Sequence, residues 1–127
     1  MRDAVATSSA PRAAGPYSQA VRAGDFLFVS GQIPIDPATG ALVEGDVAHQ
    51  TRRVLVNLQA ILAAAGASLD DVVRTTVFLA SLDDFAAMNA AYGEFFALPA
   101  PARSTVEAAG LPKGARLEID VIAYLRR

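Results

Sequence analysis

Arg103 and Glu118 are the two charged residues whose positions in the sequence suggest chemistry. Pro99 and Pro101 stop the preceding segment and fix the approach of the chain, so Arg103 stands on a stiff backbone where a strand is predicted to begin. A guanidinium held in this way presents a planar fork of donors that suits one planar carboxylate. Glu118 is the second polar group of interest, in a largely apolar strand. Both residues also fit a solvated sheet edge, because most charged side chains are simply exposed.

The stretch that holds both residues predicts two strands around a turn at Gly110, Pro112 and Gly114. From residue 117 the side chains alternate as they do in a half-buried strand. One face would carry Leu117, Ile119, Val121, Ala123 and Leu125, and the other Glu118, Asp120, Ile122 and Tyr124. Glu118 therefore points away from the apolar row.

Composition limits the classes of protein to which the chain can belong. Its 127 residues suffice for one domain, residues 1–127, with a sizeable core. A net charge of −2 gives no electrostatic case for binding nucleic acid. With no cysteine and one histidine, disulfides and thiol chemistry are excluded, and we expect neither a metal nor another cofactor. We see no signal peptide and no apolar run of membrane-spanning length, so we expect a cytoplasmic protein without a membrane partner.

Periodicity predicts the elements that must position these residues. Further strands are expected at residues 4–7, 18–21, 26–30 and 72–80. Helical spacing predicts a first helix over residues 47–65, with Asp46 as its N-cap and Gly66 as its C-cap. Ser81 to Asp84 has the spacing of a capping box and predicts a second helix that runs to about residue 96. His49 lies on the polar side of the first helix and is interpreted as a surface residue, since it has no ligand or base partner there.

This order of elements predicts an α+β fold in which two helices cover one face of a single sheet. The strands are apolar on both sides, because Phe26 and Phe28 alternate with Leu27 and Val29. The strand at residues 72–80 shows the same pattern, with Val73, Val77 and Leu79 on one side and Val72 and Phe78 on the other. A sheet that is apolar on both faces needs a second cover. The chain holds no further helix, so we expect a homo-oligomer whose sites lie between copies.

Two other residues have both a structural and a functional interpretation. Gly31 fits a bulge or bend, and it also fits a close approach of the backbone to a ligand. Asn89 lies beside the apolar stripe of the second helix and fits either a satisfied surface amide or a ligand contact. The stripe itself is typical of a core and consists of Phe85, Met88, Tyr92, Phe95 and Phe96.

Five short motifs, in order and at near-family spacing, resemble the RidA (YjgF) family from end to end of the chain. They are Gly15-Pro16-Tyr17-Ser18-Gln19-Ala20, Phe28-Val29-Ser30-Gly31-Gln32-Ile33-Pro34, Thr75-Thr76-Val77-Phe78-Leu79, Met88-Asn89-Ala90-Ala91-Tyr92, and Pro101-Ala102-Arg103-Ser104 with Leu117-Glu118-Ile119. The resemblance implies a chorismate-mutase-like α+β fold and a homotrimer whose sheets face the trimer core, with active sites in the clefts between subunits.

The resemblance also implies an enzyme of metabolite damage control, a deaminase that hydrolyses reactive 2-imino acids to 2-keto acids and ammonia. 2-Iminopropanoate and 2-iminobutanoate would be its substrates. By matching position, Arg103 would clamp the substrate carboxylate, and Glu118 would orient or activate water with Tyr17 and Ser30 nearby. Gly31 and Thr105 would offer backbone contacts, and Asn89 would line the cleft.

The chain departs from the family pattern at two places. Thr105 stands where the best-known members often have cysteine, and the link at residues 97–100 is shorter than theirs. A main-chain contact at Thr105 survives the first change. The alternative function is a trimer that binds or senses keto acids without catalysis, because the carboxylate clamp would be the same. RNA cleavage, also attached to this family, is disfavoured by the net charge of −2 without a basic stripe.

Overall fold

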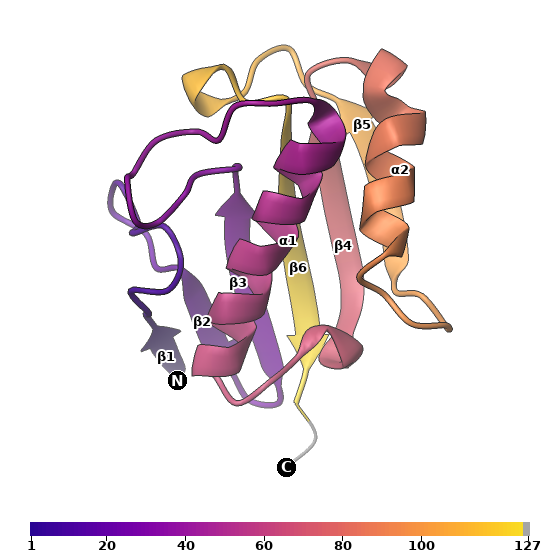
Figure 1. The fold of residues 1–127 in the computed structure, drawn as a ribbon. Coiled ribbons are helices and arrows are strands. Elements are labelled where there is room, and N and C mark those ends of the chain that lie inside the picture. Colours follow the sequence, from indigo (N-terminus) through magenta and orange to yellow (C-terminus); the bar gives the residue numbers. More distant parts are fainter. Residues whose placement is uncertain (126–127) are drawn as a thin grey trace.

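Six strands form one mixed sheet in this computed structural model, which describes residues 1–125. In chain order they are β1 (Arg2–Val5), β2 (Ala20–Ala23), β3 (Phe26–Gln32), β4 (Val72–Leu79), β5 (Ala102–Glu107) and β6 (Leu117–Tyr124). Two helices, α1 (Val47–Ala64) and α2 (Phe85–Gly93), lie on the same side of the sheet (Figure 1). The α+β prediction, with two helices on one face, is confirmed.

The strand order is β1-β2-β3-β6-β4-β5, so the last strand of the chain is inserted into the middle of the sheet. β5 and β6 follow one another around the predicted turn, but β4 lies between them and they are not neighbours. β4 and β5 run parallel and are joined through α2, whereas every other strand pair is antiparallel. Arg103 therefore lies on an edge strand and Glu118 on a central one.

The core lies between the helices and the inward row of β6. The predicted row is confirmed, because Leu117, Ile119, Val121, Ala123 and Leu125 are all buried. α1 packs its apolar stripe, including Leu55, Leu58 and Leu62, into the same cluster. The predicted N-cap is also confirmed, since Asp46 Oδ1 accepts a hydrogen bond of 2.9 Å from the His49 amide. Gly66 follows the C-cap residue Ala65 with a φ of +77°, so it is the left-handed residue one position beyond the cap.

β4 begins with a register shift that reverses the predicted faces of its first residues. The pairing with β6 is irregular between Val72 and Arg74. As a result Val72 is buried on the helix side, while Val73 is 45% exposed. The prediction that placed Val73 on one face with Val77 and Leu79 is therefore wrong, because a bulge changes the alternation locally.

The second helix is shorter than predicted and starts differently. Ser81 accepts a hydrogen bond from the Asp83 amide, but this caps a 3₁₀ turn, and α2 begins only at Phe85 without a side-chain cap. α2 ends at Gly93 rather than near residue 96. Phe96 lies beyond the helix and packs on Tyr92 with ring centroids 4.6 Å apart. A capping box of the expected kind forms instead at Ser68 and Asp71.

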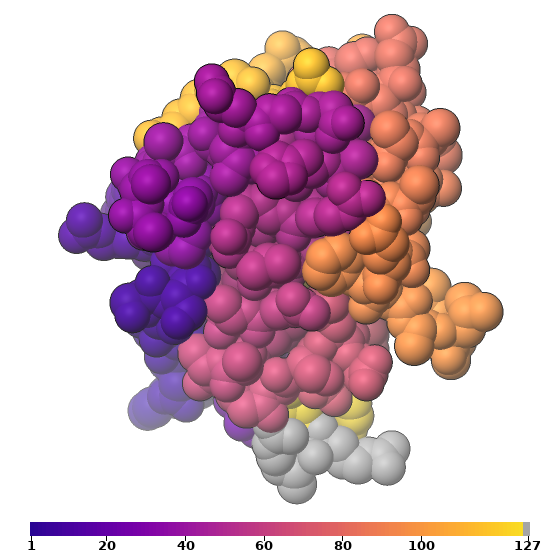
Figure 2. All heavy atoms as spheres, in the orientation of Figure 1, coloured from indigo at the N-terminus to yellow at the C-terminus, as the bar shows by residue number. Residues whose placement is uncertain are grey.

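The sheet face opposite the helices, which we call the open face, is apolar and uncovered within the chain. Its exposed large side chains include Phe26, Phe28, Val73, Val106 and Tyr124, each between 38% and 46% exposed. The prediction that the sheet is apolar on both faces is confirmed. The segment between α2 and β5 projects sideways from the edge of the body (Figure 2), and its Leu98 is 89% exposed.

Candidate active site

Glu118 lies on the open face of β6, directly against the backbone of β3. The β3–β6 register shifts between Val29 and Gln32, so Ser30 and Gly31 form a bulge. A β-carbon built on Gly31 would overlap the Glu118 carboxylate, at 2.8 Å from its Cδ atom. The bulge predicted for Gly31 is therefore confirmed, and the backbone here closely approaches the Glu118 side chain. The predicted contact of Gly31 with a ligand stays a prediction.

A cavity of about 430 Å³ opens beside this carboxylate. Glu118, Gly31, Ser30 and Tyr17 all line it. The Ser30 hydroxyl donates a hydrogen bond of 2.6 Å to the Ser18 carbonyl, and the Tyr17 hydroxyl accepts one of 3.2 Å from the backbone. The structure thus brings together four of the predicted site residues, which we call the glutamate half-site.

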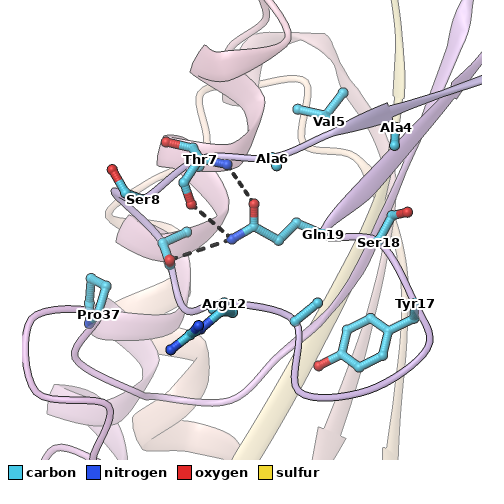
Figure 3. Close-up of a pocket in the computed structure, with 12 residues that line it drawn as sticks. Ala4, Val5, Ala6, Thr7, Ser8, Arg12, Tyr17, Ser18, Gln19 and Pro37 are labelled. Atoms are coloured by element: carbon cyan, nitrogen blue, oxygen red, sulfur yellow. Dashed lines mark hydrogen bonds between the residues drawn. The ribbon is translucent and has the colours of Figure 1, made fainter.

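The buried amide of Gln19 holds the loop that carries Tyr17. Its Oε1 accepts from the Thr7 amide at 2.7 Å, and its Nε2 donates to the carbonyls of Thr7 and Pro11 at 3.0 and 2.8 Å. Figure 3 shows this amide beside a neighbouring cavity of about 730 Å³, bordered also by Arg12, Tyr17 and Pro37. Gln19 belongs to the first family motif without a predicted role, and its side chain positions the N-terminal wall of the site.

Burial and a neighbouring carboxylate control the charge on Glu118. Burial raises the pKa of Glu118 above its ordinary value, and the like charge of Asp120 raises it further. Burial also raises the pKa of Asp120, although a hydrogen bond from Thr76 and the charge of Arg74 oppose that shift. A carboxylate with a raised pKa is a stronger base for a bound water molecule.

Arg103 lies on the other face of the sheet, over an aromatic surface of α2. Its guanidinium carbon is 4.7 Å from the ring centroid of Tyr92 and 5.6 Å from that of Phe85. The Tyr92 hydroxyl is held by a buried hydrogen bond of 2.8 Å with Thr75, the residue that pairs with Arg103 across β4 and β5. The arginine is therefore oriented by stacking, and its donors stay available for a ligand.

Asn89 and Thr105 belong to the same side as Arg103. Asn89 is exposed on α2, four residues after Phe85 and three before Tyr92, so it shares their helix face. Thr105 follows Arg103 by two residues along β5 and pairs with the buried Val77. Arg103, Asn89 and Thr105 form a second group, which we call the arginine half-site.

One chain does not bring the two half-sites together. Arg103 pairs with Thr75 and Glu118 with Phe78, on opposite faces of the sheet and with β4 between them. Two strand spacings and three residues along a strand separate their backbones by roughly 10 Å in each direction. A small ligand held by Arg103 therefore cannot reach Glu118 of the same chain.

Comparison with known proteins identifies the family. The family model described as endoribonuclease L-PSP matches residues 7–125. The chain belongs to this family, the RidA (YjgF) family. Among its relatives, a 2-iminobutanoate/2-iminopropanoate deaminase of Salmonella typhimurium is 50% identical, over 99% of this chain and 100% of that protein. Several other relatives are named only as RutC family proteins.

Solved structures of the family have the same fold. RidA from an Antarctic Psychrobacter is 44% identical with a TM-score of 0.93, covering 97% of this chain and 99% of that one. E. coli TdcF with bound serine is 44% identical with a TM-score of 0.93, covering 98% and 99%. The predicted membership and the predicted fold of a RidA protein are thereby confirmed.

The two places where the sequence was expected to depart from the RidA pattern lie in or next to the arginine half-site. Thr105 is half-buried on β5, where its backbone takes part in the pairing with β4. The short link at residues 97–100 connects α2 to β5 and immediately precedes the strand that carries Arg103. Phe85 and Tyr92 were missed as site residues, because their helical spacing was attributed to the core; Phe85 is in fact 39% exposed. Their spacing of seven residues, on a helix that packs beside the strand carrying Arg103, could have indicated that both rings face the arginine.

Residues 1–125 contain no group of three or more His, Cys, Asp or Glu residues that could hold a metal ion. Over the same residues, no helix is both long and apolar enough to cross a membrane.

Proposed function

We propose that this RidA protein hydrolyses 2-imino acids to 2-keto acids and ammonia, at sites formed between copies of a homotrimer. The observation that carries the proposal is the separation of the half-sites. One chain holds the proposed carboxylate clamp, Arg103, on the helix side of the edge strand β5, and the half-buried Glu118 on the open face of β6. Neither half suffices for the reaction, and a second copy supplies the missing half.

The open face supports assembly from several copies. It exposes Phe26, Phe28, Val73 and Tyr124 in one chain. A monomeric soluble protein rarely leaves a contiguous apolar surface of this kind uncovered. Covering it with another copy removes these side chains from water and brings foreign residues toward Glu118.

The proposed chemistry follows from the two half-sites. Arg103 binds the planar carboxylate of the substrate through two parallel hydrogen bonds and thereby orients the adjacent C=N carbon. Glu118 of another copy removes a proton from water as the water oxygen attacks that carbon, which gives a carbinolamine. Return of the proton to nitrogen, collapse of the carbinolamine and expulsion of ammonia leave the 2-keto acid. Acid–base help of about 10²–10⁴-fold is the scale expected from one positioned group.

The relatives support this substrate class. One close relative is named a deaminase of 2-iminobutanoate and 2-iminopropanoate, and the TdcF structure contains serine. All three molecules carry a carboxylate on the carbon that bears nitrogen, which is the group that Arg103 would bind. The family model also carries the name endoribonuclease, but a net charge of −2 gives RNA no general electrostatic attraction to this chain.

An imine-trapping assay tests the proposal. An amino acid oxidase generates 2-imino acids, semicarbazide competes for them, and an active deaminase lowers semicarbazone formation. We expect a reduction with the wild-type protein, none with Arg103→Ala, and a smaller kcat with little change in apparent affinity for Glu118→Gln. Arg52→Ala is a suitable control, because Arg52 pairs with Glu94 on the surface. Full activity of Arg103→Ala would refute the clamp.

Mixed oligomers test whether the two half-sites come from different copies. Alone, Arg103→Ala would be inactive and Glu118→Gln would turn over slowly, because each lacks one functional half-site. Unfolding and refolding a mixture of the two variants should restore part of the activity, because some interfaces then pair an intact arginine half-site with an intact glutamate half-site. Activity that stays at the level of the separate variants would contradict a site shared between copies.

The alternative function is binding of small carboxylic acids without turnover. The serine bound to TdcF, a structural relative, supports considering this alternative. In that case titration calorimetry would detect binding of 2-oxobutanoate, and Arg103→Ala would abolish it. The trapping assay would show no reduction with any 2-imino acid. The two functions are thus separated by comparing binding with turnover in the same preparation.

A further inference from the structure

Two cationic side chains line the cavity beside Glu118. Arg12 comes from the N-terminal loop, and Lys113 from the turn between β5 and β6. The same two residues also border an adjoining hollow of about 360 Å³, together with Pro37. Two segments that are far apart in the sequence therefore carry positive charge to one region.

This positive charge is not neutralised by the described part of the chain. Over residues 1–125, the salt bridge is that of Arg52 with Glu94, and neither Arg12 nor Lys113 takes part in one. Glu118 shares the cavity with both cations. Its pKa is raised by burial and by the like charge of Asp120. Because neither cation forms a salt bridge within residues 1–125, both can pair with an anion that enters the cavity.

The turn that presents Lys113 has an unusual backbone. Lys113 has a φ of +58°, between Pro112 and Gly114. A side chain with a β-carbon adopts this left-handed conformation uncommonly, and such residues concentrate at functional sites. Lys113 is exposed and lies in a 3₁₀ turn that is closed by hydrogen bonds from the Gly114 and Ala115 amides to the carbonyls of Leu111 and Pro112.

The cavity also has room beyond that needed for the simplest substrates. 2-Iminopropanoate and 2-iminobutanoate end in a methyl and an ethyl group, which need no polar partner. The volume of about 430 Å³ lies within the range of roughly 300–1,000 Å³ typical of sites for larger ligands. A longer side chain would extend from the reacting carbon beside Glu118 into the region of the two cations.

We propose that this cavity selects 2-imino acids whose side chain carries a second carboxylate, which Arg12 and Lys113 bind. This inference rests on the proposed function and names a substrate class for it. The reaction is unchanged: water adds to the C=N carbon, ammonia leaves, and the distal carboxylate takes no part in bond making. Arg12 and Lys113 act as specificity residues at the end of the substrate remote from the Arg103 clamp.

The test compares a dicarboxylic with a neutral substrate in the trapping assay. The imino acid formed from aspartate by an aspartate oxidase is the first, and that formed from alanine is the second. In the double variant Arg12→Ala/Lys113→Ala we expect kcat/KM to fall roughly tenfold for the dicarboxylic substrate, the scale of two exposed charge contacts. For the neutral substrate it should stay within about twofold. Added salt should reduce the difference in the wild-type protein.

Two further variants serve as controls. Arg2→Ala/Arg22→Ala removes the same charge away from the cavity, on β1 and β2, and should leave the preference unchanged. Arg12→Lys/Lys113→Arg keeps both positive charges and should retain most of the preference for the dicarboxylic substrate. Equal losses on both substrates, or no loss on the dicarboxylic one, would overturn the inference while leaving the deaminase intact.

Measuring the binding of keto acids tests the cationic subsite independently of catalysis. If the wild-type protein hydrolyses no 2-imino acid, the proposed function fails, and calorimetry with 2-oxoglutarate and 2-oxobutanoate decides the inference. Tighter binding of 2-oxoglutarate that disappears in Arg12→Ala/Lys113→Ala would support the cationic subsite. Equal binding of both keto acids to the wild-type protein would refute it.

Discussion

Replacing Gly31 by alanine should disable Glu118 without unfolding the protein. The new β-carbon would lie 2.8 Å from Glu118 Cδ and 3.1 Å from Cγ, whereas ordinary contacts begin at 3.4 Å. Cδ must therefore retreat by 3.4 − 2.8 = 0.6 Å, and Oε2, which is nearer still, by more. The atoms that move belong to the end of a side chain, so the backbone is preserved. A displacement on the order of 1 Å in a catalytic group costs about 10²-fold in rate.

The assay is kcat/KM from imine trapping, with stability followed by urea unfolding. We expect a loss of about 100-fold for Gly31→Ala, with little change in the urea midpoint. Gly110→Ala is the matched control, because nothing lies within 4 Å of its added β-carbon and its φ is not positive. The double variant Gly31→Ala/Glu118→Gln should be no slower than Glu118→Gln alone, since both changes act on one group. If Gly31→Ala kept wild-type activity, or if the losses multiplied, Glu118 would not be the group that Gly31 positions.

Two further predictions concern charge and assembly. Because burial and Asp120 raise the folded pKa of Glu118, the stability that Glu118 contributes is present below its unfolded pKa near 4.5 and is lost as pH rises through the folded pKa. Glu118→Gln should flatten this decline in unfolding measurements made above pH 4.5. If the slope is the same in both proteins, Glu118 is not the titrating group. Phe28→Glu would place an uncompensated charge, costing about 3–5 kcal/mol, in the proposed interface, so light scattering should show dissociation toward the 13.2 kDa chain. Val56→Glu on α1, also exposed, should leave the assembly intact, and equal effects of both changes would contradict an interface on the open face.

Local signals in the sequence predicted local structure well. Asp46 was identified as an N-cap because a carboxylate preceded a helical apolar stripe, and the alternation from Leu117 onward correctly predicted which side chains are buried. Alternation indicates the face of a strand but not its neighbour, so the insertion of β6 between β3 and β4 was not predictable in this way. The reversal at Val72 and Val73 has a similar cause. A one-residue bulge depends on pairing with a distant strand, and the sequence of β4 alone does not encode it.

The residues of the candidate site came mostly from family motifs, and their physical relations came from the structure. Gly31 and Glu118 come from separate motifs. Only the β3–β6 register shows that the Glu118 side chain leaves no room for a β-carbon at position 31. The contact of Arg103 with Tyr92 was not predictable from sequence, because Tyr92 fits the helical pattern of a core residue. Its relative exposure is indeed only 6%. A side chain that is both core and ligand support cannot be distinguished from sequence periodicity alone.

The placement of the half-sites also restricts the symmetry of the proposed assembly. A two-fold contact in which two open faces meet would bring Glu118 toward the open face of its partner, while both arginine half-sites stayed on the outer, helix-covered sides. Arg103 can meet a foreign Glu118 only where the β5 edge of one copy lies against the open face of the next. Such a contact joins two different surfaces, and a contact of this type forms a ring when its rotation closes. The separation of clamp and base on one chain therefore favours a cyclic assembly, such as the proposed trimer, over a two-fold dimer.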